Sequence, residues 1–298
     1  MEKEELKNYQ KAGKILAEVL KKAKKSIKPG QKLLEIAEKA EKGIISLQGV
    51  PAFPANLSKN HYAAHFSPSF DDVEIVGEKD LLTVDLGVHL DGFVADAAFT
   101  IDFSGENGKM IEASEDALEA ALSVIEEGVE IRKIGKAIEE AIRKKGFNPI
   151  QNLSGHGLER WITHAAPSIP NIDNNDDRVL EDGMVIAIEP FATDGRGFVR
   201  EGAQAEIFSL EEKRPVRNMD TRKIISFIDE TYHTLPFAER WLMDELKISE
   251  FKRRIAMREL MQRKCIRAFP ILHEEEGRIV AQSETSVILN SGKLIKLV

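Results

Sequence analysis

The chain carries an internal repeat, which restricts the folds open to it more than any other feature of the sequence. Residues 4–27 and 32–47 have the apolar spacing of two amphipathic helices, and residues 112–127 and 131–145 show the same spacing. A shift of 98 residues superposes the two pairs of segments. The aligned positions are Leu20 with Leu118, Ala23 with Ala121, Ile27 with Ile125, Leu33 with Ile131, Ile36 with Ile134, Glu41 with Glu139, and Ile44 with Ile142.

The break between the helices is repeated as well. It reads Pro29-Gly30 in the first pair, and the same shift places Gly30 on Gly128. A repeat of about 100 residues is too long for a solenoid unit. Because strand-like sequence follows each helix pair, we predict an α+β domain whose two halves are related by a pseudo-twofold axis. The functional site is then expected between the halves.

Four acidic residues and one histidine lie in or beside apolar segments, where a bare charge is hard to explain. Burying an unpaired carboxylate costs several kcal/mol or forces it to take a proton. A cluster of such groups therefore indicates a cation that keeps the carboxylates ionised. The five residues are Asp85, Asp96, His156, Glu189 and Glu284.

Two of these acids belong to a predicted hairpin formed by residues 81–89 and 93–102, which are rich in Val, Leu, Phe and Thr. A turn signal, Leu-Asp-Gly, stands between the two strands. If its first two residues form the loop, Asp85 lies directly opposite Asp96. If its last two residues form the loop, Asp96 is the diagonal neighbour of the residue opposite Asp85. In both registers the carboxylates point to one face of the sheet, because side chains alternate along a strand.

The composition excludes several classes of protein. The 298 residues carry a net charge of −8, so bulk attraction to nucleic acid or anionic lipid is not expected. The single cysteine, Cys265, leaves no disulfide framework and no thiolate metal site. The charged start is not a signal peptide, and no apolar run approaches the ~20 residues that span a bilayer. We therefore expect a soluble, cytoplasmic protein.

Histidines form a second group of candidates. His156 lies between Gly155 and Gly157, which would let a backbone approach a ligand closely, and His164 follows eight residues later. His65 stands in an apolar segment, Ala-Ala-His-Phe. Taken singly, each of these histidines could equally be structural or exposed. Two others, His61 and His89, are expected at the surface.

With these residues in place, the chain resembles the methionine aminopeptidases, which have the creatinase-like pita-bread fold, and it looks like a short archaeal member of type 2. The resemblance covers nearly the whole chain, and five motifs in order at these spacings make it specific. The motifs are Ala63-Ala64-His65-Phe66, Asp85-Leu86-Gly87 with Asp96, Gly155-His156-Gly157 with His164, Ile188-Glu189-Pro190-Phe191, and Gln282-Ser283-Glu284. Thr234-Leu235-Pro236-Phe237 with Arg240-Trp241 is similar to a type 2 segment.

Segment lengths indicate the subfamily. The 94 residues between Glu189 and Glu284 leave room for a helical insert, which type 2 enzymes carry and type 1 enzymes lack. We predict a catalytic domain made of residues 1–212 and 269–298, interrupted by an insert over 213–268. The 84 residues before Asp85 are too few for the N-terminal domain of prolidases and aminopeptidase P. The expected helices of the insert are Thr221–Asp229, Phe237–Leu246 and Ser249–Cys265.

The resemblance implies a metal centre and a reaction. Asp85, Asp96, His156, Glu189 and Glu284 would hold two divalent ions, with Asp96 and Glu284 bridging them. Oxygen-dominated ligation with one imidazole suits Mn, Fe(II) or Co better than a thiolate-type zinc site, although Zn stays open. The implied activity removes the N-terminal methionine from nascent proteins when the second residue is small, with Glu189 as general base.

Substrate contacts are implied for three further residues. His65 and His164 would bind the substrate, and His164 would stabilise the tetrahedral oxyanion. Phe53 aligns with an aromatic wall of the methionine pocket, although a packed loop phenylalanine is an equal alternative. The chain departs from its relatives at three positions expected to reshape the pocket. These are Trp161, Thr163 and Phe269.

The sequence also bears on binding partners and leaves two alternative functions open. Residues 251–267 hold seven Lys or Arg and one Glu, which is most often a solvated helix face but suggests docking on ribosomal RNA. Specific nucleic acids and membranes are not expected as partners, and we expect a monomer. A prolidase-like enzyme would use the same five ligands on X-Pro dipeptides. A catalytically inactive binding protein is the second alternative, although such proteins usually lose ligands.

Overall fold

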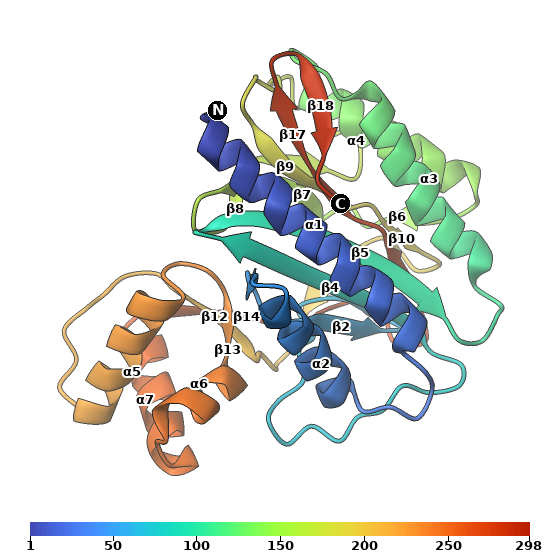
Figure 1. Ribbon diagram of the computed structural model, residues 1–298. Coiled ribbons are helices and arrows are strands. Elements are labelled where there is room, and N and C mark those ends of the chain that lie inside the picture. The colour runs from blue at the N-terminus through green and yellow to red at the C-terminus, as the bar shows by residue number, and fades with distance from the viewer.

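The computed structural model describes the backbone of residues 1–298 and every side chain except that of Asp244. Its two halves each place a pair of helices against a sheet, and a third, smaller body of helices lies beside the first half (Figure 1). The helices are α1 (Lys3–Ser26), α2 (Leu33–Ser46), α3 (Gly108–Val124), α4 (Ile131–Lys144), α5 (Met219–Thr231), α6 (Glu239–Leu246) and α7 (Glu250–Gln262). Among the described residues, none of these helices combines the length and apolar content that a bilayer crossing requires.

The strands form several sheets. The first half holds β4 between β1 and β2, with β5 paired to β4, and the second half has the strand order β18-β17-β9-β7-β8. Shorter sheets have the orders β16-β10-β6, β11-β15-β3 and β13-β12-β14. The strand bounds are β1 (Val50–Pro51), β2 (Asn56–Lys59), β3 (Tyr62–Ala64), β4 (Leu81–Leu90), β5 (Phe93–Asp102), β6 (Asn148–Pro149), β7 (Ser154–Glu159), β8 (Ile162–Pro170), β9 (Val185–Ile188), β10 (Phe191–Thr193), β11 (Arg200–Glu201), β12 (Ile207–Leu210), β13 (Phe237–Ala238), β14 (Ile266–Phe269), β15 (Leu272–His273), β16 (Val280–Gln282), β17 (Thr285–Asn290) and β18 (Lys293–Lys296).

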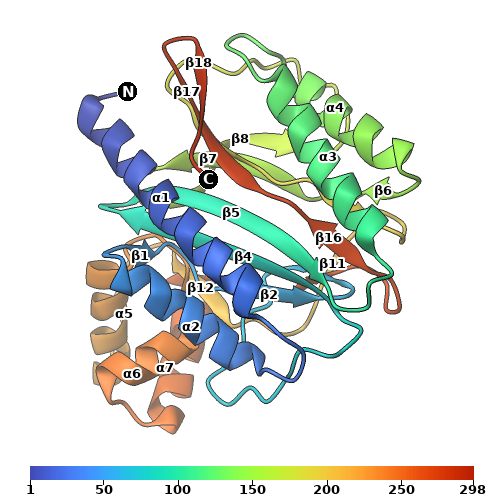
Figure 2. The same cartoon turned by 45° about the vertical axis from the view of Figure 1, so that its right-hand side comes forward.

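The predicted repeat is present in space as well as in sequence. Helix α1 crosses β4 and β5 in the first half, whereas α3 and α4 lie together against the second half (Figures 1 and 2). Each half has its own apolar core. Gly30 and Gly128 both have positive φ, at 86° and 83°, so the same left-handed turn separates the helices of each pair. This confirms the two-half α+β prediction.

Burial explains why the repeated segments become helices. In α4, Ile131, Ile134, Ile138 and Ile142 recur at three- and four-residue spacing, and all four are buried against the second sheet. Helix α1 approaches the C-terminal segment so closely at Gly13 that an added Cβ would lie 2.3 Å from a backbone oxygen. Both helix pairs are therefore held by one apolar face rather than by their intrinsic propensity.

The halves join through β5 and the segment that leads into β17. The backbone of Ala98 and Glu284 is hydrogen-bonded in both directions, at 3.1 and 3.4 Å. The Ser286 hydroxyl accepts from the Asp96 N–H and donates to the Asp96 carbonyl, both at 2.8 Å. These bonds fix Asp96 and Glu284, two of the predicted ligands, at the seam between the halves.

The insert has an apolar cluster of its own, formed by α5, α6, α7 and the strands β12, β13 and β14. The helices fall where the sequence predicts them, with one exception. Phe237 and Ala238 form strand β13 instead of the first turn of α6, because they pair with Phe208 and Ile207 of β12. The exact boundaries of the insert, at 213 and 268, remain a prediction.

One histidine was misplaced from the sequence. His89 is buried at 5% exposure, whereas a surface position was expected. Its Nδ1 accepts from the Gly92 N–H at 3.2 Å, and its ring meets the Trp161 ring edge-on. His61 is only partly exposed. The local sequence does not reveal that the neighbouring β7–β8 turn covers this end of the hairpin and buries His89.

A buried ion pair ties the insert to the first half. Arg240, 6% exposed, donates to Glu41 of α2 and, at 2.9 Å, to the Ser67 hydroxyl. Glu41 also accepts from the Trp241 indole N–H at 3.0 Å and the Ala55 N–H at 3.1 Å. The segment that carries Phe53 and His65 is thus held from both sides.

Breaking this pair should destabilise the protein strongly. Arg240→Met leaves the Glu41 carboxylate buried without its partner, which costs about 3–5 kcal/mol. Arg254→Met is the matched control, because Arg254 is exposed and its pair with Glu250 contributes less than about 1 kcal/mol. Urea unfolding should show a large shift of the midpoint for the first variant only. Equal, small shifts in both variants would contradict the assigned role of the pair.

Candidate active site

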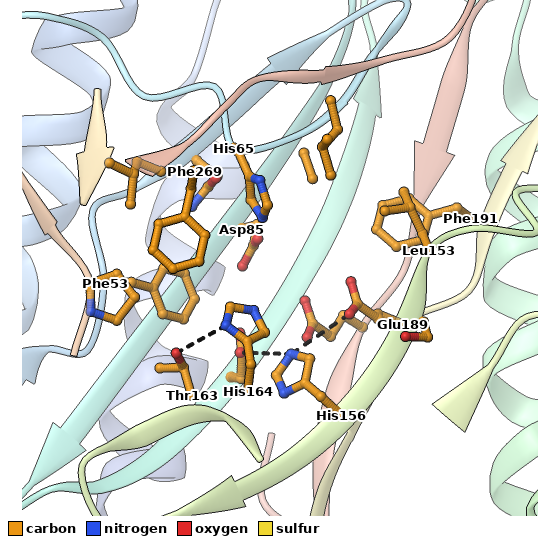
Figure 3. A pocket seen from close by; sticks show the side chains of 18 of the residues that line it. Phe53, His65, Asp85, Leu153, His156, Thr163, His164, Glu189, Phe191 and Phe269 are labelled. Carbon is orange, nitrogen blue, oxygen red and sulfur yellow. Dashed lines mark hydrogen bonds and ion pairs between the residues drawn. The ribbon is translucent and has the colours of Figure 1, made fainter. Parts of the chain in front are cut away.

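A cavity of about 390 Å³ opens between the two halves and is bordered by the insert. All five predicted ligands line it, together with Phe53, His65 and His164. Figure 3 labels Asp85, His156 and Glu189 among the ligands. Asp85 comes from β4 and Asp96 from β5. His156 lies on β7, Glu189 directly follows β9, and Glu284 directly precedes β17. Both halves of the fold therefore contribute side chains to one chamber.

The hairpin register decides between the two alternatives left by the sequence. Leu90 pairs with Phe93, so Asp91 and Gly92 form the loop, with φ of 53° and 83°. Asp85 pairs with Ala98, and Gly87 pairs with Asp96. The second register is the one found, and Asp96 lies diagonally across the hairpin from Asp85.

The remaining ligand candidates converge on Asp96. One ligand atom each from Asp96, His156 and Glu284 lie within 4.8 Å of one another. The His156 Nε2 atom is 3.9 Å from the Asp96 Oδ2 atom and 3.6 Å from the Glu189 Oε1 atom. The His156 Nδ1 atom lies 3.3 Å from the Gly157 carbonyl; when Nδ1 carries the proton it donates there, which leaves the Nε2 lone pair facing the carboxylates.

Burial and mutual repulsion perturb every carboxyl in this group. Burial raises the pKa of Asp85 to about 7. Burial, and then the charges of Asp85 and Glu189, hold the pKa of Asp96 well above its usual range. Burial also raises the pKa of Glu189 and of Glu284, with added repulsion from the neighbouring carboxylates. Without a cation, this arrangement would keep protons at neutral pH.

Two carboxylate oxygen atoms bear on whether the cluster can hold a metal ion. The Oδ1 atoms of Asp85 and Asp96 are buried and have no hydrogen-bond partner among the described atoms. Buried polar atoms are rarely left unpaired, and a missing ion is one of the usual reasons. Four carboxylates and one imidazole form a hard, oxygen-rich donor set that fits divalent cations such as Mn, Fe(II) or Co. The residues present thus fit a metal centre.

The raised pKa of Asp85 gives a pH-dependent prediction for metal-free protein. The folded carboxyl binds its proton more tightly than the unfolded one, so its contribution to stability falls as pH rises from about 4 to about 7. Asp85→Asn removes this loss. In denaturant titrations with chelator present, the variant should match the wild type near pH 4. It should exceed the wild type by up to about 4 kcal/mol above pH 7.

The buried histidines are common to both proteins and largely cancel in this difference. Loss of the Asp85 charge also relieves its repulsion of Asp96, Glu189 and Glu284, which adds to the gain of the variant at high pH. A stability difference that stays constant across the pH range would contradict the buried, unpaired state of Asp85.

His65 and His164 both point into the cavity, and Phe269 lies beside both rings (Figure 3). Burial lowers the pKa of His65 to about 4 and holds that of His164 well below its usual range. Both rings are therefore neutral at pH 7. The His65 Nδ1 atom lies 3.1 Å from the Pro270 carbonyl, to which it would donate, and the His164 Nδ1 atom lies 3.3 Å from the Thr163 hydroxyl.

Glycines shape the pocket for a reason that the sequence did not reveal. An added Cβ at Gly87 would lie 2.2 Å from the Phe53 ring, so this glycine lets the ring approach β4 closely, two residues along the strand from Asp85. At Gly155 and Gly157 the added Cβ would meet backbone oxygens at 2.2 and 2.1 Å. These oxygens belong to the neighbouring strands. Close packing of the strands therefore accounts for these two glycines, and the expectation that they admit a ligand stays a prediction.

The three departures from the family pattern fall in different places. Thr163 and Phe269 line the cavity, as expected. Trp161 is not among the lining residues, which corrects the expectation that it reshapes the pocket. It sits in the β7–β8 turn with a φ of 66°, and its ring packs 4.0 Å from that of His233 in the insert.

Sequence reasoning assigned no role in the site to several polar residues in or beside the cavity. The Gln282 amide donates to Glu189 at 3.3 Å and to Glu284 at 3.2 Å, so it orients both carboxylates. Its position two residues before Glu284 was the available signal, because such residues share a face of a strand. Asn56 and Arg267 line the cavity itself, whereas Gln282 lies behind the two carboxylates that it contacts. Neither Asn56 nor Arg267 carries a local sequence signal that would have assigned it there.

The comparisons with known proteins agree with this geometry. Residues 7–217 match metallopeptidase family M24, and the chain belongs to that family. It is 48% identical to a methionine aminopeptidase of Thermococcus onnurineus and 44% identical to one of Archaeoglobus fulgidus. Each alignment covers 94% of this chain and 94% of the relative. Within the family, the chain belongs to the methionine aminopeptidases.

Solved structures support the fold. A thermophilic Arx1 superposes with a TM-score of 0.88 at 17% identity and covers 100% of this chain and 91% of that chain. A methionine aminopeptidase from Thermotoga maritima superposes with a TM-score of 0.71 at 22% identity and covers 100% of this chain and 97% of that chain. These likenesses confirm the predicted pita-bread fold.

Proposed function

We propose that this methionine aminopeptidase holds two divalent ions with Asp85, Asp96, His156, Glu189 and Glu284, and that Asp96 and Glu284 bridge them. The observation that carries the proposal is the pair of orphaned Oδ1 atoms of Asp85 and Asp96 inside a buried cluster of acids. Four carboxylates balance the charge of two divalent ions. Mn, Fe(II), Co and Zn are the candidate metals, and the oxygen-rich donor set favours the first three.

The residues around this centre have separate roles in peptide hydrolysis. When bound, the ions lower the pKa of a water molecule and polarise the scissile carbonyl. Glu189 takes the proton from the attacking water and passes it to the leaving amine. His164, neutral and facing the cavity, donates to the oxyanion that develops on the carbonyl. Gln282 keeps the Glu189 and Glu284 carboxylates in place.

The remaining lining residues select the substrate. The Phe53 ring, packed on Gly87, forms an apolar wall for the methionine side chain. The His65 Nε2 atom is left free to bind the peptide by the contact of Nδ1 with Pro270. We infer that the second residue of the substrate must be small, because the peptide after the scissile bond has to fit in the same cavity of about 390 Å³. The substrates are the N-termini of nascent proteins.

A comparison of peptide substrates tests this function. Purified protein with Mn²⁺ or Co²⁺ should release methionine from Met-Ala-Ser peptides. Met-Glu-Ser peptides and Ala-Pro dipeptides should react much more slowly. Preferred cleavage of the X-Pro bond would favour a prolidase, which uses a similar set of ligands. Retention of metal without cleavage of any of these peptides would favour a binding protein.

The cellular setting is part of the proposal. We infer a cytoplasmic monomer that meets its substrates as they are synthesised. Docking of residues 251–267 on ribosomal RNA has weak support. Arg253 in this segment is 1% exposed and paired with Glu239, and three other basic side chains are paired with neighbouring acids. These are Lys252 with Asp220, Arg254 with Glu250, and Arg263 with Glu259.

A further inference from the structure

Arg267 lies at the rim of the cavity and differs from every other charged residue that lines it. The other charged lining residues are the four carboxylates of the proposed metal centre, and Arg267 is the only lysine or arginine among the lining residues. It comes from β14, two residues before Phe269, so both side chains share one face of the strand. Its guanidinium carbon lies 4.7 Å from the centre of the Phe269 ring.

This stacking places a positive charge beside the groups that bind the peptide. The Phe269 ring lies 5.5 Å from the His65 ring and 5.9 Å from the His164 ring. The charge is felt at both histidines, because burial first and Arg267 among the smaller causes lower their pKa values. Arg267 itself is exposed and forms no ion pair with the described acidic side chains. Its charge is thus available to a ligand.

The charges that line the cavity leave the positive charge of Arg267 unbalanced. In the proposed function, two divalent ions neutralise the four carboxylates at the floor of the cavity. The free amino group of the substrate binds at that end. The residues after the scissile bond must leave past the rim, where Arg267 remains as the uncompensated charge. A local cation near a partly enclosed opening attracts anions more strongly than an isolated surface charge does.

We propose that Arg267 is a specificity-determining residue, which favours substrates that carry an acidic side chain shortly after the second residue. The inference rests on the proposed aminopeptidase function and adds a subsite for the downstream peptide. The plainer role for Arg267 is to cap the Phe269 ring. The two roles differ in their consequence, because capping alone gives no preference between acidic and basic substrates.

Three series of C-terminally amidated peptides test the proposal. Each series starts with Met-Ala and carries Glu, Gln or Lys at position three, four or five. At low salt, kcat/KM for the best Glu peptide should exceed that for the Lys peptide by about tenfold, since each of the two charge interactions contributes roughly two- to fivefold. The ratio should fall in 0.5 M salt. Cleavage of the Gln peptides measures the proposed function independently of this preference.

Charge variants separate the two roles of Arg267. Arg267→Gln should bring the Glu-to-Lys ratio close to one, and Arg267→Glu should invert it. Arg258→Gln is the control, because this exposed arginine of α7 does not line the cavity and its loss changes the net charge equally. The control should keep the wild-type ratio. A ratio near one in the wild type at all three positions, with normal cleavage of the Gln peptides, would overturn the proposal.

Discussion

Replacing Glu189 by glutamine is expected to lower kcat by about 10²–10⁴-fold, the range typical of a lost general base. The amide keeps the size of the side chain and one oxygen that can reach a cation. It cannot take the proton from the attacking water. The side chain lies 3.6 Å from His156 and accepts from Gln282, so its position should change little. Steady-state rates on a Met-Ala peptide at saturating metal measure the effect.

A second glutamate provides the control for this substitution. Burial, and then the charge of Glu239, raise the pKa of Glu206 to about 7, but Glu206 does not line the cavity. Glu206→Gln should therefore leave kcat within about twofold of the wild type, as expected for a change away from the reacting atoms. Equal losses in the two variants would show that a general loss of buried charge, and not proton transfer by Glu189, causes the effect.

Replacing Asp96 by alanine should abolish measurable turnover and lower the metal content. Asp96 lies at the seam of the two halves, within reach of His156 and Glu284, and it is 4% exposed. Loss of a bridging carboxylate removes a ligand from both proposed ions. The helix content measured by circular dichroism should stay largely unchanged, because removal of one like charge also relieves repulsion in the metal-free cluster.

The matched control for Asp96 lies on the same strand. Asp102 ends β5, where it accepts from the Ser104 and Asn107 N–H groups, outside the cavity. Asp102→Ala should lose some stability at this turn but retain two ions and activity. Near-normal turnover by Asp96→Ala in a metal-buffered assay would rule out the assignment of two ions.

The sequence predicted the fold well where the apolar spacing of helices and the glycine breaks between them agree. The isoleucines of α4 and the aligned breaks at Gly30 and Gly128 were enough to predict the two helix pairs. Local sequence patterns failed to predict secondary structure or burial where contacts with residues distant in the chain determine them. Phe237 belongs to strand β13 because it pairs with β12, and His89 is buried because the β7–β8 turn covers it.

The candidate site could be predicted in part. Charged residues in apolar strands stand out in a sequence, so Asp85 and Glu189 were found without a structure. Arg267 and Asn56 were missed, since nothing in their immediate neighbours indicates that they face the cavity. The register of the hairpin also stayed open, because both readings of the Leu-Asp-Gly turn place Asp85 and Asp96 on one face. Only the pairing of Leu90 with Phe93 decides it.

We propose that the buried acid cluster holds two divalent ions. Calorimetric titration of metal-free protein with Mn²⁺ or Co²⁺ tests it most directly, with hydrolysis of a Met-Ala peptide followed in parallel. We predict two ions per chain, release of protons on binding as the raised carboxyl pKa values fall, and activity that appears only with metal. Saturation at a single ion per chain, or full activity in protein stripped of metal, would contradict the account.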